Sequence, residues 1–113
     1  LKVETKNTLV TNQYAEKAIK IPIAHGEGKY FADEKTMKAL IQNDQILFKY
    51  CDENGNITEK ANPNGSLLNI AGVCNANRNV FGMMPHPERA ADQELNNQDG
   101  LTLFKSILSE IQL

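Results

Sequence analysis

Residues 72–90 read GVCNANRNVFGMMPHPERA and are the most informative stretch of the chain. Two short apolar runs, 67–74 and 79–84, flank a polar turn at 75–78. Short apolar runs of this kind, separated by a few turn-forming residues, are typical of paired antiparallel strands. The tetrapeptide PHPE follows at 85–88. The sequence therefore predicts a β-hairpin that leads directly into a stiff segment with two prolines.

The segment PHPE carries one of the two histidines of the chain, His86, and a glutamate two residues later, Glu88. Each proline disfavours the helical region for the residue before it, so we expect Met84 and His86 to be extended. In extended backbone, residues i and i+2 project to the same side. A carboxylate beside one imidazole nitrogen holds the ring, and the other nitrogen can exchange a proton with a nucleophile. Spacing alone favours a surface turn with an incidental histidine and glutamate, because paired histidines are common without catalysis.

Strand patterns also precede this stretch. Residues 17–24, KAIKIPIA, alternate between apolar and polar and predict a strand with Pro22 at an edge or a bend. Residues 45–51, QILFKYC, predict a second strand. Between 52 and 66 the chain is rich in Asn, Gly and Pro, which is typical of a long loop or irregular hairpin.

Two helices are predicted from capping residues and apolar spacing. Asp33 can cap a helix over 34–42, and Asp99 can cap a second helix from 100 to about 111. Each helix has one apolar face, which implies that it packs on a sheet. The chain is therefore expected to be an α/β protein.

Length and composition exclude several classes of protein. With 113 residues, 41% of them apolar and 23% charged, the chain has the size and composition of one folded domain. The net charge of -2 offers no basic field for nucleic acid, and no apolar run reaches membrane-spanning length. Cys51 and Cys74 could pair in principle, but two cysteines do not make a disulfide framework, and they suit a reducing cytosol at least as well.

Three segments resemble one family. NVFGMMPHPERA at 79–90 strongly resembles the segment with the catalytic histidine and glutamate in class I (triad) glutamine amidotransferases, nearest to members that serve purine biosynthesis. IPIAHGEGKYF at 21–31 is similar to the glycine-rich loop of that family, and DGLTLFKSIL at 99–108 is similar to its closing helix. The resemblance covers essentially the whole chain in the order of the family. It implies that residues 1–113 are the C-terminal portion of a single flavodoxin-like α/β amidotransferase domain, with a mixed sheet and an antiparallel hairpin near its end.

The resemblance also implies roles for individual residues. His86 would be the general base and Glu88 the carboxylate that orients it. Backbone near His25, Gly26, Glu27 and Gly28 would help to form the substrate pocket for glutamine, with His25 lining the pocket rather than transferring protons. No residue is expected to bind a metal.

The cysteine nearest to this pair, Cys74, is not expected to be the catalytic nucleophile, although its context resembles one. Its context GVCN resembles the G-V-C-N-G motif around the nucleophile of the family. However, Ala76 stands where glycine is expected, and a second strand follows instead of a helix. The family's nucleophile also lies far upstream of its histidine. Cys74, like Cys51, is therefore expected to be a small, partly buried strand residue, and the nucleophile elbow is expected in an N-terminal half that this chain lacks.

The resemblance further implies the partners. Glutamine would be the substrate, and ammonia would pass to a separate large synthetase subunit that uses ATP and magnesium, with a small third subunit in the complex. The glutaminase part itself would need no cofactor, and the protein would be cytoplasmic. The 113 residues alone are expected to be inactive.

Three alternatives remain open from the sequence. The chain could be a self-contained cysteine hydrolase that uses Cys74, His86 and Glu88. It could instead hold a metal between its two cysteines and two histidines, although close ligand pairs such as C-x-x-C are missing. It could also be a non-catalytic half-domain that associates through an exposed strand edge.

Overall fold

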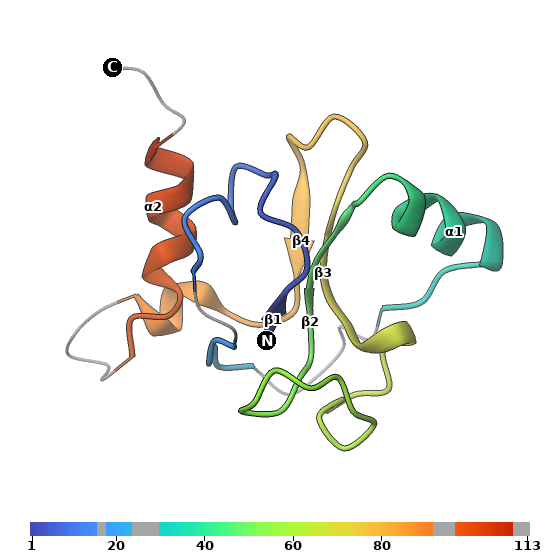
Figure 1. Cartoon of the computed structure of the whole chain (residues 1–113), viewed down its shortest axis with the longest axis horizontal. Helices are drawn as coiled ribbons and strands as arrows, with labels where there is room; N and C mark the ends of the chain where they lie inside the picture. The colour runs from blue at the N-terminus through green and yellow to red at the C-terminus, as the bar shows by residue number, and fades with distance from the viewer. Residues whose placement is uncertain (16–17, 24–29, 92–96, 110–113) are drawn as a thin grey trace.

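The computed structural model describes residues 1–15, 18–23, 30–91 and 97–109, and two helices flank a sheet within them (Figure 1). The sheet has four strands in the order β1-β2-β3-β4, and every pairing is antiparallel. The strands are β1 Lys2–Val3, β2 Ile46–Lys49, β3 Ile70–Cys74 and β4 Phe81–Met83. The α/β class and the hairpin near the end of the chain are thus confirmed.

The hairpin of β3 and β4 ends in a turn built by Asn75. Its side-chain Oδ1 accepts hydrogen bonds from the backbone N–H groups of Asn79 and Val80, both at 3.0 Å. Arg78 adopts a left-handed φ of 57° in this turn. The register pairs Gly72 with Met83 and Cys74 with Phe81. Cys74 therefore lies at the turn end of the hairpin, while the chain after Met83 leaves from the other end.

The helices α1 (Glu34–Gln42) and α2 (Leu101–Ser109) lie on opposite sides of the sheet (Figure 1). Asp33 caps α1, since its carboxylate accepts a 2.7 Å hydrogen bond from the Thr36 N–H. The buried side chains of α1 pack with Ile46 and Ile70, whereas Leu103 of α2 packs in a second cluster with Leu47. One helix thus covers part of each face of the sheet.

The second cluster is centred on Phe48, whose side chain is 0% exposed. The ring of Tyr14 meets it edge-on at a centroid distance of 6.0 Å. A Cβ at Gly72 would lie 3.0 Å from Phe48 Cδ2 and 3.2 Å from Met83 Cβ. The absence of a side chain at this β3 position therefore lets the Phe48 ring pack against the hairpin.

The strand expected over 17–24 does not form in its described part, 18–23. The alternation was correct, because Ile19 and Ile21 are buried while Lys20 is exposed. The backbone bonds, however, go to scattered partners. The Ile19 N–H donates to the Leu1 carbonyl at 2.8 Å, and Pro22 has no N–H to donate. The segment is therefore extended without belonging to the sheet.

Several predicted element boundaries also differ from the structure. The strand expected over 67–74 begins only at Ile70, because Leu68 and Asn69 have left-handed φ angles of 51° and 60°. A short 3-10 turn, η1 (Leu67–Asn69), occupies those positions. Asp99, expected as the cap of the last helix, accepts a hydrogen bond from the Lys20 N–H at 2.7 Å.

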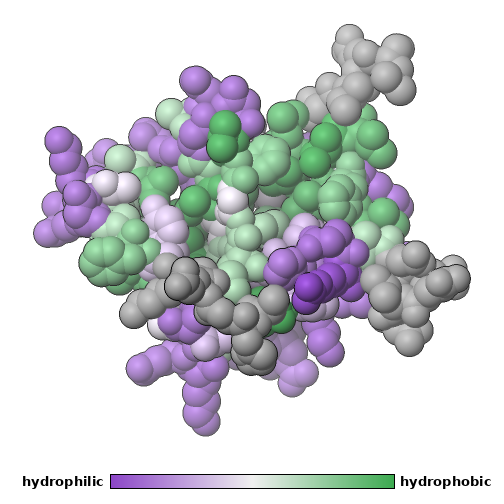
Figure 2. Space-filling view, turned by 180° about the vertical axis from the view of Figure 1, so that it is seen from behind, coloured by the Kyte–Doolittle hydropathy of each residue, from purple (hydrophilic) through white to green (hydrophobic). Residues whose placement is uncertain are grey.

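The surface carries both apolar and polar side chains, and Figure 2 shows apolar residues beside charged ones on one face. Among the residues that the structure describes, Phe31, Val80 and Leu108 are the most exposed large apolar side chains, at 76%, 64% and 64%. Within the described ranges, no helix is long and apolar enough to cross a membrane.

Candidate active site

His86 and Glu88 are in direct contact. The distance between His86 Nδ1 and Glu88 Oε1 is 2.7 Å, and the side chains are 33% and 57% exposed. His86 has extended backbone (φ -102°, ψ 92°), as the following proline predicted. Glu88, however, lies inside a 3-10 turn, η2 (Pro87–Ala90). The expected pairing is confirmed, but a tight turn brings the two side chains together, not the alternation of a strand.

Backbone hydrogen bonds hold His86 on both sides. Its N–H donates to the Pro22 carbonyl at 2.7 Å, and its carbonyl accepts from the Arg89 N–H at 3.0 Å. Just before it, the Met84 N–H donates to the Ala71 carbonyl of β3 at 3.0 Å. The histidine is therefore held between the end of the hairpin and the extended segment 18–23.

The electrostatics of the pair favour an ionised Glu88. The hydrogen bond from its own backbone N–H, and then the one from the His86 ring, hold the pKa of Glu88 below its usual value of 4.5. An ionised carboxylate can only accept hydrogen bonds, so the proton between the two groups belongs to Nδ1 of His86. In a neutral imidazole the lone pair is then on Nε2, and that nitrogen can act as a base.

Cys74 is not part of this pair. It lies opposite Phe81 at the turn end of the hairpin, whereas His86 follows the other end, beyond Ala71. At about 3.3 Å per residue, the three residues from Ala71 to Cys74 alone span about 10 Å. The Cys74 side chain is buried, and this burial raises the pKa of its thiol, which nearby Arg78 opposes. A cysteine triad of Cys74, His86 and Glu88 does not form in this structure.

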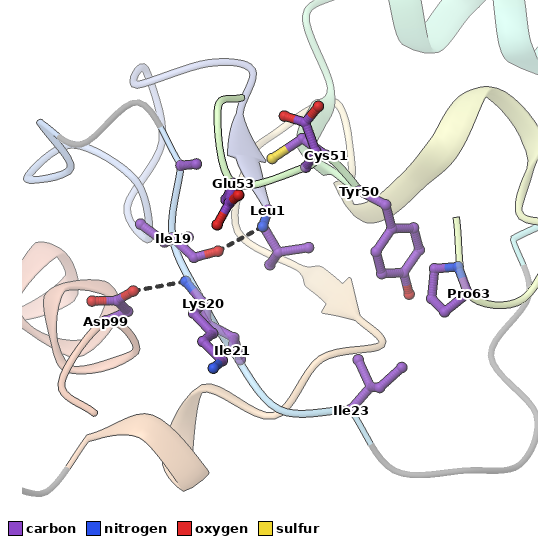
Figure 3. Close-up of a pocket in the computed structure, with 12 residues that line it drawn as sticks. Leu1, Ile19, Lys20, Ile21, Ile23, Tyr50, Cys51, Glu53, Pro63 and Asp99 are labelled. Carbon is purple, nitrogen blue, oxygen red and sulfur yellow. Dashed lines mark hydrogen bonds between the residues drawn. The ribbon is translucent and has the colours of Figure 1, made fainter. Parts of the chain in front are cut away.

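Cys51 lies elsewhere, at a cavity of about 500 Å³ (Figure 3). Tyr50, Pro63 and Ile23 line this cavity with it, and neither His86 nor Glu88 is among the lining residues. The segment 18–23 separates the two regions. Its Ile21 and Ile23 face the cavity, while the carbonyl of Pro22 between them binds His86. The sequence offered no signal for this use of Pro22, whose partner lies 64 positions later (86 − 22).

The remaining predicted site residues belong to the glycine-rich loop. His25, Gly26, Glu27 and Gly28 lie outside the described residues. Within the described ranges, no three His, Cys, Asp or Glu side chains lie close enough together to hold a metal ion. The described part of the candidate site therefore consists of His86, Glu88 and the backbone that holds them.

Comparison with known proteins places these residues in a wider context. Residues 1–106 match the family of CobB/CobQ-like glutamine amidotransferase domains. A protein named phosphoribosylformylglycinamidine synthase subunit PurQ from Methanosarcina barkeri is 51% identical over 112 residues, which are 98% of this chain and 48% of that protein. The protein of the same name from Acaryochloris marina is 54% identical over 112 residues, again 98% of this chain and 48% of that protein.

A solved structure is similar over the same extent. The structure of PurLQS from Thermotoga maritima superposes with a TM-score of 0.74 at 36% sequence identity, covering 98% of this chain and 45% of that chain. The chain thus spans about half the length of the curated relatives that it matches.

Proposed function

This chain belongs to the family of CobB/CobQ-like glutamine amidotransferase domains, and from that premise we propose that it is part of the glutaminase subunit of a phosphoribosylformylglycinamidine synthase. Relatives that are about half identical over nearly the whole chain carry that name. The whole subunit would hydrolyse glutamine and supply ammonia for purine biosynthesis in the cytoplasm.

The proposed reaction begins with a cysteine thiolate of the whole subunit. The sulfur attacks the side-chain amide carbon of glutamine, and a carbon–sulfur bond forms. When the tetrahedral intermediate collapses, the carbon–nitrogen bond breaks and ammonia leaves as it takes up a proton. Water then attacks the glutamyl thioester, which releases glutamate and restores the thiol.

His86 would move the protons in both halves of this reaction. Its Nε2 would receive the proton of the thiol, deliver it to the leaving nitrogen and then accept one from the attacking water. Glu88 would hold the ring through Nδ1, so that Nε2 faces the reacting groups. The single observation that carries this proposal is the 2.7 Å contact between His86 Nδ1 and Glu88 Oε1.

The nucleophile would be a cysteine outside these 113 residues. The supporting observation is the place of Cys74, buried at the turn end of the hairpin with a raised thiol pKa. The backbone of His25 to Gly28 would line the glutamine pocket, since it follows the segment whose Pro22 carbonyl binds His86. The 113 residues alone would not release ammonia.

The ammonia would pass to a partner. The solved neighbour is called PurLQS, a name that combines more than one component, and this supports a separate synthetase subunit. We propose that this large subunit uses ATP and magnesium, that a small third subunit completes the complex, and that the glutaminase part needs no cofactor of its own.

Ammonia release from glutamine by the complete enzyme tests the proposal. Replacing the imidazole with His86→Gln should lower kcat by about 10²- to 10⁴-fold, the usual contribution of a general acid–base group. A Cys74→Ser variant is the matched control and should retain its activity. Full activity of the His86→Gln enzyme would refute the assigned role.

A further inference from the structure

Gly100, at the start of α2, lies unusually close to the backbone between the two candidate catalytic residues. A Cβ at position 100 would lie 2.1 Å from the Pro87 carbonyl oxygen, 2.7 Å from its carbon and 2.8 Å from its Cα. Real Cβ atoms essentially never come within 3.0 Å of such atoms, and backbone cannot swing aside as the end of a side chain can. Gly100 does not have a left-handed φ. The requirement for glycine is therefore one of space alone.

The same glycine also holds the other end of the η2 turn. Its N–H donates to the carbonyl of Ala90 at 2.9 Å, and the Ala90 side chain is 0% exposed. Its own carbonyl accepts the Leu103 N–H at 3.2 Å, in the first turn of α2. Pro87 and Ala90 are the first and last residues of η2, so Gly100 contacts both ends of the turn that contains Glu88.

This turn is weakly stabilised by itself. A single 3-10 turn has poor hydrogen-bond geometry, and the Glu88 side chain is largely exposed. The position of its carboxylate therefore depends on what packs behind the turn. The start of α2 provides that packing, because Leu103 anchors the helix in the core.

We propose that Gly100 is a positioning residue for the His86–Glu88 pair. By lacking a Cβ it lets α2 begin directly against the Pro87 carbonyl, and this contact holds η2 where Glu88 reaches His86 Nδ1. A side chain at position 100 would push Pro87 away and separate the two groups. The geometric part stands on the structure alone, and its effect on catalysis rests on the proposed function.

The chain offers two matched glycine controls. A Cβ at Gly82, in β4, would meet nothing within 4 Å, so Gly82→Ala adds the same atom in open space. A Cβ at Gly72 would press on Phe48 and Met83 in the core, away from η2. Gly72→Ala is therefore a control for loss of stability without displacement of Pro87.

The test is nuclear magnetic resonance of the intact protein, because it reads the pair without glutamine. In Gly100→Ala, the nitrogen shifts of His86 should no longer show the proton held on Nδ1, and the pKa of the Glu88 carboxyl should rise toward 4.5. Gly82→Ala should leave both signals unchanged. Gly72→Ala should lower the melting temperature and still leave both signals unchanged.

If Gly100→Ala fails to fold, Leu103→Ala takes its place. This change loosens the first turn of α2 without adding an atom at position 100. It should weaken the Nδ1 signal of His86, whereas Gly72→Ala should keep that signal at a similar loss of stability. Unchanged His86 and Glu88 signals in the folded Gly100→Ala variant, or in the Leu103→Ala variant that replaces it, would overturn the proposal.

Kinetics of the complete enzyme separate this proposal from the proposed function. Gly100→Ala should lower kcat by about 10²-fold, the usual cost of a misplaced catalytic group, with little change in KM for glutamine. If Gly100→Ala disrupts the His86–Glu88 contact but keeps full activity, the catalytic role of these two residues is refuted and the positioning by Gly100 is supported. If Gly100→Ala keeps the His86–Glu88 contact but has low activity, the positioning by Gly100 is refuted and the proposed function is unaffected.

Discussion

Glu88 Oε1 lies 2.7 Å from His86 Nδ1, although the two residues belong to different kinds of backbone. His86 is extended and bonded to Pro22, whereas Glu88 is in the η2 turn that packs against the start of α2. Three parts of the chain thus fix this one short contact: the segment with Pro22, the η2 turn and the start of α2. A change in any of the three should disturb it.

Removing the charge of Glu88 tests its orienting role. Glu88→Gln keeps the size of the side chain but no longer requires the proton on Nδ1, so the imidazole can adopt the wrong tautomer. We expect kcat for ammonia release by the complete enzyme to fall by about 10²-fold or more, between wild type and His86→Gln. Glu59→Gln, the same change in an exposed loop, is the control. Equal activity of both variants would contradict the prediction.

The pH dependence of stability follows from the lowered pKa of Glu88. A carboxyl whose pKa is lower in the folded protein binds protons more readily when unfolded. The stabilising effect of the Glu88 carboxylate should therefore be complete above about pH 4.5, which is the usual pKa of the group. It should vanish as the pH falls through the lower pKa of the folded protein. The measurement is the unfolding free energy of wild type minus that of Glu88→Gln across this pH range. A difference that grows on acidification would have the wrong sign.

The buried thiol of Cys74 should react slowly. Burial raises its pKa above the usual 9.0, so little thiolate exists at neutral pH and reagents have poor access. In a Cys51→Ser background, iodoacetamide should alkylate Cys74 slowly in the native protein and much faster after unfolding. Rapid alkylation of the native protein at neutral pH would instead indicate an activated nucleophile.

The core prediction concerns Phe48, which is completely buried against Tyr14. Phe48→Ala should lower the free energy of unfolding by about 3–5 kcal/mol, the usual cost of truncating a buried aromatic residue. Phe31→Ala is the matched control, since its side chain is 76% exposed and its removal should change stability by about 0.5 kcal/mol or less. Chemical denaturation of both variants checks this, and similar losses would refute the described core.

Local signals predicted much of the fold. Asp33 caps α1 over the predicted residues, because capping and apolar spacing depend only on neighbours in sequence. The contact of His86 with Glu88 was predicted as well, and Pro87 does keep His86 extended, but the η2 turn brings Glu88 to it and not the strand alternation from which the contact was predicted.

Contacts between distant residues were not predictable. The segment 18–23 has the alternation of a strand, but its N–H groups bond to Leu1 and the Asp99 side chain, which no local pattern reveals. The contact of Gly100 with Pro87 joins two elements through tertiary packing. Glycine is an accepted residue at the N-terminus of a helix, so the sequence did not distinguish this one.

The central claim is that Cys74 is not the nucleophile that works with His86 and Glu88. Its most direct test is labelling with a glutamine-like diazoketone that alkylates the nucleophile of such enzymes, followed by peptide mapping. We predict that the label in the intact protein appears on a cysteine outside these 113 residues. His86→Gln should slow this labelling, while Cys74→Ser should leave it unchanged. Label on Cys74 would contradict the account, because the buried cysteine of the hairpin would then be the nucleophile.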